Sequence, residues 1–181
     1  MTDIQSPKEK REEQLVKNQG DAYQASYDML MEEDPHVGKE VNDYFVTASF
    51  EPAEGMYIPD IDKSLIWRPP SDEDNQHVEV IVRDRKDKRF IPQLLISMKL
   101  YDKNQKIVFN KEIPFIWHPF VYHYGTNGSI PDEGVYVPEV TIAMPLFHRH
   151  DEVRGERYTK DVMVKLDSVH LTPGKKPYGP E

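Results

Sequence analysis

Residues 77–84 read HVEVIVRD, and this stretch decides the fold that the sequence predicts. Three valines occupy alternate positions, which is the period of a β-strand with one buried face. His77 and Glu79 lie two residues apart, so their side chains project together from the opposite face. The stretch therefore predicts a strand with one apolar side and one side that carries an imidazole and a carboxylate.

The same period of two continues along the chain after residue 43. Alternating segments are DYFVTASF, QLLISMKLY, KIVFNKEIPF, GVYVPEVTIAMP and DVMVKLDSVHL. Turn-forming sequences such as YDKNQK, TNGSIPDEG and DEVRGE separate them. Roughly six or seven short strands without intervening helices predict an all-β fold, an antiparallel β-sandwich.

The N-terminal part of the chain has a helical period instead. Residues 7–20 are highly charged and predict a mobile helix. Asp21 then resembles an N-cap with Gln24 reaching back to it, which predicts a separate amphipathic helix over 22–33. The sequence DP at 34–35 ends that helix, and its apolar stripe is expected to lie on the main domain.

Three regions follow from these patterns. We expect a charged helical extension over 1–40, a β-sandwich domain over 41–172 and a loose tail over 173–181. Within the sandwich domain, residues 51–76 show little period and predict a long connection, which in a compact domain is usually functional or poorly ordered.

Composition excludes several classes of protein. The chain has 181 residues and a formal charge of −9, with no basic face that would bind nucleic acid. It has no cysteine, so disulfides and thiolate metal sites are excluded. No apolar run approaches a membrane span, so a membrane-embedded protein is not expected. No signal-peptide core is present, so the protein is either cytosolic or has lost an export signal.

Five of the seven histidines lie where a site could assemble. His123 lies between two tyrosines in VYHYGTNG (121–128), where Gly125 is expected to allow a sharp turn. His118 lies five residues earlier, and His150 ends the sequence HRH near the end of a later strand.

Imidazole is the commonest protein ligand for first-row transition metals. Without thiolates, a His-rich site completed by Glu79 or a methionine is the natural form. The affinity series favours Cu(II), whereas availability favours iron or manganese. Each motif alone also has a simpler interpretation, because HxE on a strand is usually a solvated face. No spacing matches the sharp zinc motifs such as HExxH.

Between residues 44 and 164 the sequence resembles the periplasmic iron-transport accessory proteins, the metal-binding companions of the high-affinity iron permease. The matching segments are PAEGM (52–56), HVE (77–79), RFIPQLLISMKL (89–100), HYGTN (123–127), GVY (134–136) and RHDE (149–152) with Gly155. They extend over about two thirds of the chain, and their combination is more specific than any one of them.

The resemblance implies an immunoglobulin-like, cupredoxin-type β-sandwich that forms a homodimer, with a metal site near the dimer interface. It implies that His77, His123 and His150 are copper ligands. It places Glu79 close to the metal, where it joins the coordination of iron or manganese.

One part of the family pattern is missing. The family has a methionine ligand in a Met-Pro-Met segment before HYG, and here that segment reads IPF (113–115). His118 lies in the same loop, and Met56 matches another family methionine, so each is a candidate to replace the thioether. Nitrogen in place of sulfur would weaken a preference for Cu(I).

The leading hypothesis is therefore a non-enzymatic protein that binds Cu(II), Fe(II) or Mn(II) and presents it to a membrane iron permease. A periplasmic location follows from the resemblance. A cupin-like metal-dependent oxygenase or isomerase is the alternative, although the order HxE…HYG…RH differs from the usual cupin order. A third hypothesis is an interaction module whose histidines are merely exposed.

Overall fold

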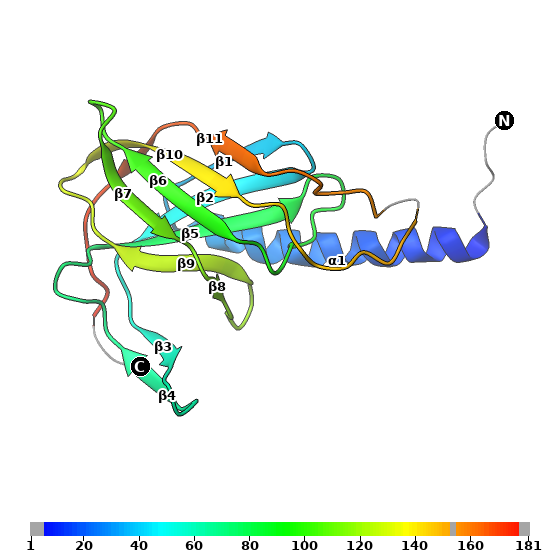
Figure 1. Ribbon diagram of the computed structural model, residues 1–181, viewed down its shortest axis with the longest axis horizontal. Helices are drawn as coiled ribbons and strands as arrows, with labels where there is room; N and C mark the ends of the chain where they lie inside the picture. The colour runs from blue at the N-terminus through cyan, green and yellow to red at the C-terminus, as the bar shows by residue number, and fades with distance from the viewer. Residues whose placement is uncertain (1–5, 153–154, 178–181) are drawn as a thin grey trace.

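The computed structural model describes residues 6–152 and 155–177 of the chain, which form a two-layered β-sandwich with one long helix (Figure 1). The first sheet has the order β1-β2-β5-β9-β8. Its strands are β1 (His36–Val41), β2 (Tyr44–Glu51), β5 (Gln76–Asp84), β8 (Phe115–Ile116) and β9 (His123–Gly128). All neighbours within it are antiparallel.

The second sheet has the order β11-β10-β6-β7, and β12 also pairs with β10. Its strands are β6 (Ile96–Tyr101), β7 (Ile107–Glu112), β10 (Gly134–Ile142), β11 (Val162–Lys165) and β12 (Val169–Leu171). The valines of β5 pack with Met98, Leu100 and Val140 of this sheet in one continuous core. The predicted antiparallel β-sandwich is confirmed.

The N-terminal helix is longer than the sequence pattern indicates. Helix α1 (Pro7–Met31) begins after Ser6, whose hydroxyl and backbone form a capping box with Glu9. The prediction of a separate helix capped by Asp21 is wrong, because Asp21 lies inside α1 and pairs with Lys17 one turn earlier. Gln24 donates to the Asp28 carboxylate, not back to Asp21.

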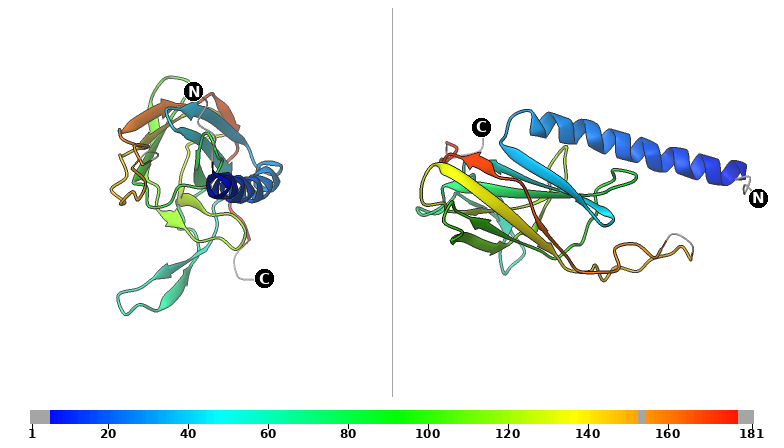
Figure 2. Two further views of the ribbon diagram at one scale, coloured as in Figure 1. Left: turned by 90° about the vertical axis from the view of Figure 1, so that its right-hand side faces the viewer. Right: turned by 90° about the horizontal axis from the view of Figure 1, so that it is seen from above.

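The second half of α1 lies on the outer face of the first sheet, while its first half extends past the sandwich (Figure 2). Tyr27 and Met31 pack against Ile81 of β5. Gly20 permits this close approach, since a Cβ there would lie 1.8 Å from the Asp87 carbonyl oxygen. The Tyr23 hydroxyl donates to the carbonyl of Tyr122, just before β9, at 2.5 Å. The helix therefore covers β5 and supports the loop that leads into β9.

Two segments expected to be irregular are ordered. Residues 51–76 contain a hairpin of β3 (Met56–Pro59) and β4 (Leu65–Arg68). The tail is anchored as far as residue 177, because Gly174 donates to the Asn75 carbonyl at 2.7 Å and Lys176 to the Ala53 carbonyl at 2.8 Å. The loose tail is thus wrong for residues 173–177, and residues 178–181 lie outside the described part.

The division at residues 40 and 172 stays a prediction, although β1 already pairs with β2 from His36 onward. Among the residues that the structure describes, no helix is both long and apolar enough to cross a lipid bilayer.

Candidate metal centre

Strand β5 organises the site because all nine of its residues are buried. Its valines face the sandwich core, and its other face carries His77 and Glu79, which are 0% and 3% exposed. The interpretation of HxE as a solvated face is therefore wrong. A buried carboxylate and imidazole on a sheet surface require partners, because desolvation without compensation is costly.

His123 reaches the same place from the neighbouring strand. The register pairs Glu79 with Gly125 and His77 with Asn127, so alternate residues of β9 face these two side chains. The expected turn at VYHYGTNG is wrong over residues 123–128, which form β9 itself. His123 begins that strand and is 3% exposed.

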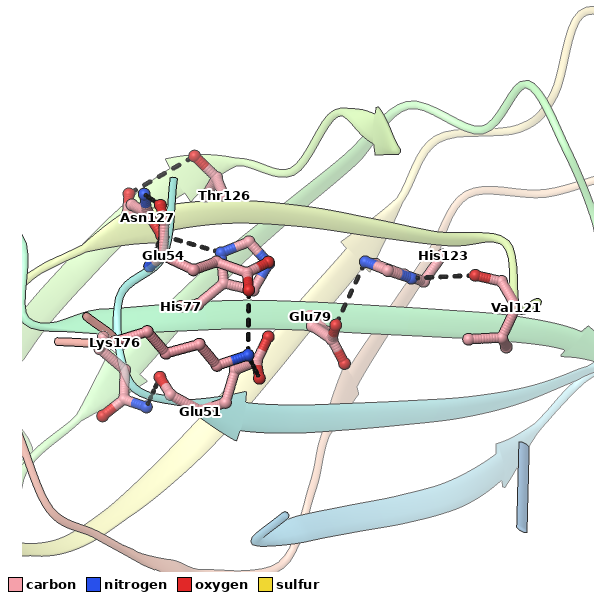
Figure 3. A network of polar contacts seen from close by, with 10 residues as sticks. Glu51, Glu54, His77, Glu79, Val121, His123, Thr126, Asn127 and Lys176 are labelled. Carbon is pink, nitrogen blue, oxygen red and sulfur yellow. Dashed lines mark hydrogen bonds and ion pairs between the residues drawn. The ribbon is translucent and has the colours of Figure 1, made fainter. Parts of the chain in front are cut away.

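The three side chains lie side by side on the outer face of the first sheet (Figure 3). One ligand atom each from His77, Glu79 and His123 lies within 4.8 Å of the others. Nε2 of His123 is 3.1 Å from Oε1 of Glu79. The 3.1 Å separation suits two donors that are each about 2.0–2.2 Å from a common ion.

A hydrogen-bond network orients His77. The Nδ2 amide of Asn127 donates to the Glu54 carbonyl at 2.6 Å, which leaves Oδ1 of Asn127 as the acceptor for Nδ1 of His77 at 2.9 Å. Nδ1 of His77 therefore carries the proton, and its Nε2 presents a lone pair to the site. Such a second partner is what metal-binding histidines generally have.

His123 is oriented in the same way. Its Nδ1 donates to the Val121 carbonyl at 3.2 Å, so its Nε2 lone pair faces Glu79. Within the described part of the chain, Nε2 of His77 and Oε2 of Glu79 are buried without a hydrogen-bond partner. Two buried imidazole lone pairs and a carboxylate that share one point fit a divalent metal ion.

Burial also sets the protonation of these groups. It raises the pKa of Glu79 to about 8, and nearby Glu51 and Glu54 raise it further. Burial lowers the pKa of His123 to about 4 and lowers that of His77. At neutral pH both imidazoles are neutral and able to bind metal, while Glu79 holds a proton that a metal would displace.

Gly125 keeps the site open. A Cβ at this position would lie 2.9 Å from Nε2 of His77 and 2.8 Å from Cδ1 of Ile116. The need for glycine here is steric: a methyl group would fill the space that the His77 lone pair faces.

The other predicted ligands are not among the donors that lie within 4.8 Å of one another, although His118 lies close by. The ring of half-buried His118 is 5.7 Å from that of His123, and its Nδ1 accepts from the Phe120 amide. Met56 begins the β3–β4 hairpin, opposite Arg68. His150 is exposed on the segment between β10 and β11. Their roles as ligands stay predictions.

Three residues beside the site were not predicted: Glu51, Glu54 and Lys176. Glu51 is the register partner of His77, and ligand atoms of Glu51, Glu54 and His77 also lie within 4.8 Å of one another. Burial and the neighbouring Glu54 raise the pKa of Glu51 to about 7. Glu54 lies within the PAEGM segment already noted, but nothing in the sequence indicates that Lys176 meets both carboxylates.

These features define an antiparallel β-sandwich that carries a buried His–Glu–His cluster on the outer face of one sheet. Several solved structures with a similar fold are described as copper-bound or copper-reconstituted. The copper-reconstituted P19 protein from Campylobacter jejuni is 19% identical, covers 79% of this chain and 99% of its own, and has a TM-score of 0.65. FetP from uropathogenic E. coli, expressed in the periplasm, is 18% identical over 77% of this chain and 95% of its own, with a TM-score of 0.60.

A copper-bound variant of FetP also matches, with 18% identity and a TM-score of 0.60. It covers 75% of this chain and 94% of its own. No protein-family profile and no curated protein matches the sequence. At this identity the comparison confirms the predicted resemblance at the level of the fold.

Proposed function

We propose that this protein binds a divalent transition-metal ion at His77, Glu79 and His123 and assists iron uptake without being an enzyme. The observation that supports this most is the convergence of two oriented, buried imidazole lone pairs with a carboxylate within 4.8 Å. Structural histidines in a core generally use both ring nitrogens for hydrogen bonds, whereas Nε2 of His77 has no such partner among the described residues.

The donor set suits more than one ion. Among divalent first-row ions, sites with two imidazoles bind Cu(II) most tightly. Copper is bound in two P19 structures and in a variant of FetP. The carboxylate of Glu79 adds a hard oxygen ligand, which favours Fe(II) and Mn(II). We propose Cu(II) or Fe(II) as the bound ion, with Mn(II) as a further candidate.

Catalysis is the less favoured alternative. A cleft of about 510 Å³ lies beside α1 and the loop before β9, but none of the three donors lines it. Its aromatic lining comes from Tyr23, Phe90, Phe115, Tyr122, Phe147 and Tyr158. An enzyme would need an open metal position that faces a pocket for an organic substrate. The separation of cleft and donors therefore supports binding over a cupin-like reaction.

We further propose that two copies form a homodimer, that His150 of one copy completes the site of the other, and that the protein works in the periplasm beside an iron permease. The exposed segment that carries His150 extends away from the sandwich (Figure 2), which suits a ligand supplied to another copy. Sedimentation and the copper spectrum of His150→Ala, with His148→Ala as the matched control, test this. A dimer whose copper spectrum is unchanged by His150→Ala would contradict the shared site.

The central experiment is calorimetric titration with Cu(II). His123→Ala should weaken binding at least about 100-fold, since it removes one of the three convergent donors. His36→Ala is the control, because His36 is exposed on β1 and its Nδ1 bonds to the nearby Asp34 carbonyl. Unchanged affinity in the His123 variant would remove His123 from the site and overturn the proposed function.

A further inference from the structure

A second cluster of charged groups adjoins the metal centre (Figure 3). The ammonium of Lys176 contacts Oε2 of Glu51 and lies 2.9 Å from Oε2 of Glu54. Glu51 ends β2 and Glu54 precedes β3, whereas Lys176 comes from the C-terminal segment. One ammonium faces two carboxyl groups, so the cluster has a net negative charge when both are ionised.

The cluster lies at the outer edge of the metal centre. The side chains of Glu51 and Glu54 are 11% and 30% exposed, compared with 4% for both Glu79 and His123. An ion that approaches from this side would therefore meet Glu54 and Glu51 before it reaches the buried donors. Two carboxylates at partial burial attract cations strongly because solvent screening is weak there.

His77 provides an independent sign of a ligand at this place. Its side chain is 0% exposed, and its Nε2 lies 3.9 Å from Oε1 of Glu54 without a hydrogen bond. The Asn127 amide already binds Nδ1 of His77, so the orientation of the ring is fixed and the lone pair of Nε2 is left for a ligand. Ligand atoms of Glu51, Glu54 and His77 all lie within 4.8 Å of one another.

We propose that Glu51, Glu54 and His77 form a second divalent-cation subsite, and that Lys176 is a tethered competitor whose ammonium must leave the two carboxylates before the ion binds. This proposal rests on the proposed function in one respect, namely that His77 is also a ligand of the inner metal centre. Nε2 of His77 has one lone pair, so it serves an ion in one subsite at a time. Two carboxylates and one imidazole suit Mn(II) or Fe(II) better than a soft ion.

The tether consists of the backbone on either side of Lys176. Gly174 accepts from the Ala53 amide at 2.9 Å, and the amide of Lys176 donates to the Ala53 carbonyl at 2.8 Å. The ammonium of Lys175 binds the carbonyls of Ser71 and Asp72 at 2.7 and 2.9 Å. These bonds keep the competing ammonium beside its carboxylates at a high effective concentration.

The test is titration of the full chain with Mn(II), followed by electron paramagnetic resonance of the free ion. Lys176→Met should raise the affinity for Mn(II) about tenfold or more, because the ion no longer displaces an ammonium. Lys175→Met is the matched control. It removes the same charge one residue away, from a side chain whose ammonium binds backbone carbonyls. Equal gains in both variants would overturn the proposal, as would no gain at Lys176.

A second series separates this proposal from the function of the inner site. In a His123→Ala background, Lys176→Met should still bind Mn(II), and adding Glu54→Gln should abolish that binding. Mn(II) binding that depends on His123 but not on Glu54 would overturn the second subsite and leave the proposed function intact. Conversely, Cu(II) affinity could be unchanged by His123→Ala while the gain in Mn(II) affinity from Lys176→Met still requires Glu54. That result would overturn the proposed function and retain the second subsite. Melting curves establish that each variant folds, and Lys176→Gln provides a second removal of the charge.

Discussion

Nε2 of His123 and Oε1 of Glu79 lie 3.1 Å apart, and each side chain is 4% exposed. Both atoms are acceptors unless one of them carries a proton. Nδ1 of His123 already donates to Val121, and burial raises the pKa of Glu79 to about 8 while it lowers that of His123 to about 4. The proton therefore belongs to Glu79 at neutral pH, and the metal centre holds it until a metal arrives.

Metal binding at pH 7 should accordingly release about one proton from Glu79. Affinity should rise as pH increases toward about 8 and then level off, since Glu79 is then already ionised. Imidazoles with ordinary pKa values would place this dependence near 6.5. Titrations with Cu(II) in buffers of different ionisation enthalpy measure the release. A heat that is independent of buffer, or a release that survives Glu79→Gln, would contradict the assignment.

The metal-free protein should lose stability as pH rises from 6.5 to 8. The folded pKa of Glu79 is raised above its unfolded value of 4.5, so its contribution is complete below 4.5 and is lost as pH rises toward about 8. Burial lowers the pKa values of His77 and His123, which oppose this trend mainly below about 7, where the unfolded imidazoles still bind protons. The loss over this window is about 2 kcal/mol from Glu79.

Denaturant unfolding at the two pH values, with a chelator present, measures this difference. Glu79→Gln keeps the shape of the side chain without the charge, so it should reduce the slope of the profile while it weakens metal binding. The smaller slope that remains comes from Glu51, whose pKa burial raises to about 7. If the unmutated protein were as stable at pH 8 as at pH 6.5, or more stable, the raised pKa of Glu79 would be contradicted.

The architecture was largely predictable because the strands alternate core-facing apolar residues with other residues, although β5 is buried on both faces. The alternation in β5 and β10 identifies the core side directly, and both strands lie where the sequence indicates. The helix was less predictable, since residues 7–20 have no apolar stripe of their own. They remain helical through the Ser6–Glu9 capping box and through continuity with the docked half of α1.

The site was predictable only in part. His77 and Glu79 share a face by their spacing, and β9 brings His123 beside them through strand pairing, which a single sequence does not specify. The contact of Lys176 with Glu51 joins residues 125 positions apart, and no local pattern encodes it. The missing methionine of the family likewise cannot be assigned from spacing, because His118 lies in the loop before β9 and Met56 begins β3.

Asn127 should control affinity without touching the metal. Asn127→Ala removes the acceptor for Nδ1 of His77, so the ring loses its orientation and fixed tautomer, and affinity for Cu(II) should fall about 10–100-fold. Asn127→Asp keeps the acceptor and should recover part of the affinity, although it loses the donor to the Glu54 carbonyl. Titration of both variants separates orientation of His77 from general damage. Equal losses in the two would indicate that the amide acts only through the backbone of Glu54.

Gly125 provides the sharpest steric test of the site. Gly125→Ala would place a methyl group 2.9 Å from Nε2 of His77 and 2.8 Å from Cδ1 of Ile116. The Ile116 side chain is able to shift, but His77 is fully buried and bound to Asn127, so the methyl group should block the lone pair. We expect affinity for Cu(II) to fall at least about tenfold, with a stability cost of about 1–3 kcal/mol from overpacking.

The control for this steric test is Gly134→Ala, because a Cβ at residue 134 would meet only Cε2 of Tyr136, at 3.9 Å, and has room. Calorimetry and thermal melts of the two variants compare the same chemical change at a blocked and an open position. Because the stability cost at residue 125 comes partly from Ile116, Gly125→Ala combined with Ile116→Val should recover some stability without restoring affinity. Full recovery of Cu(II) binding in that double variant would mean that the space beside His77 is not where the ion binds.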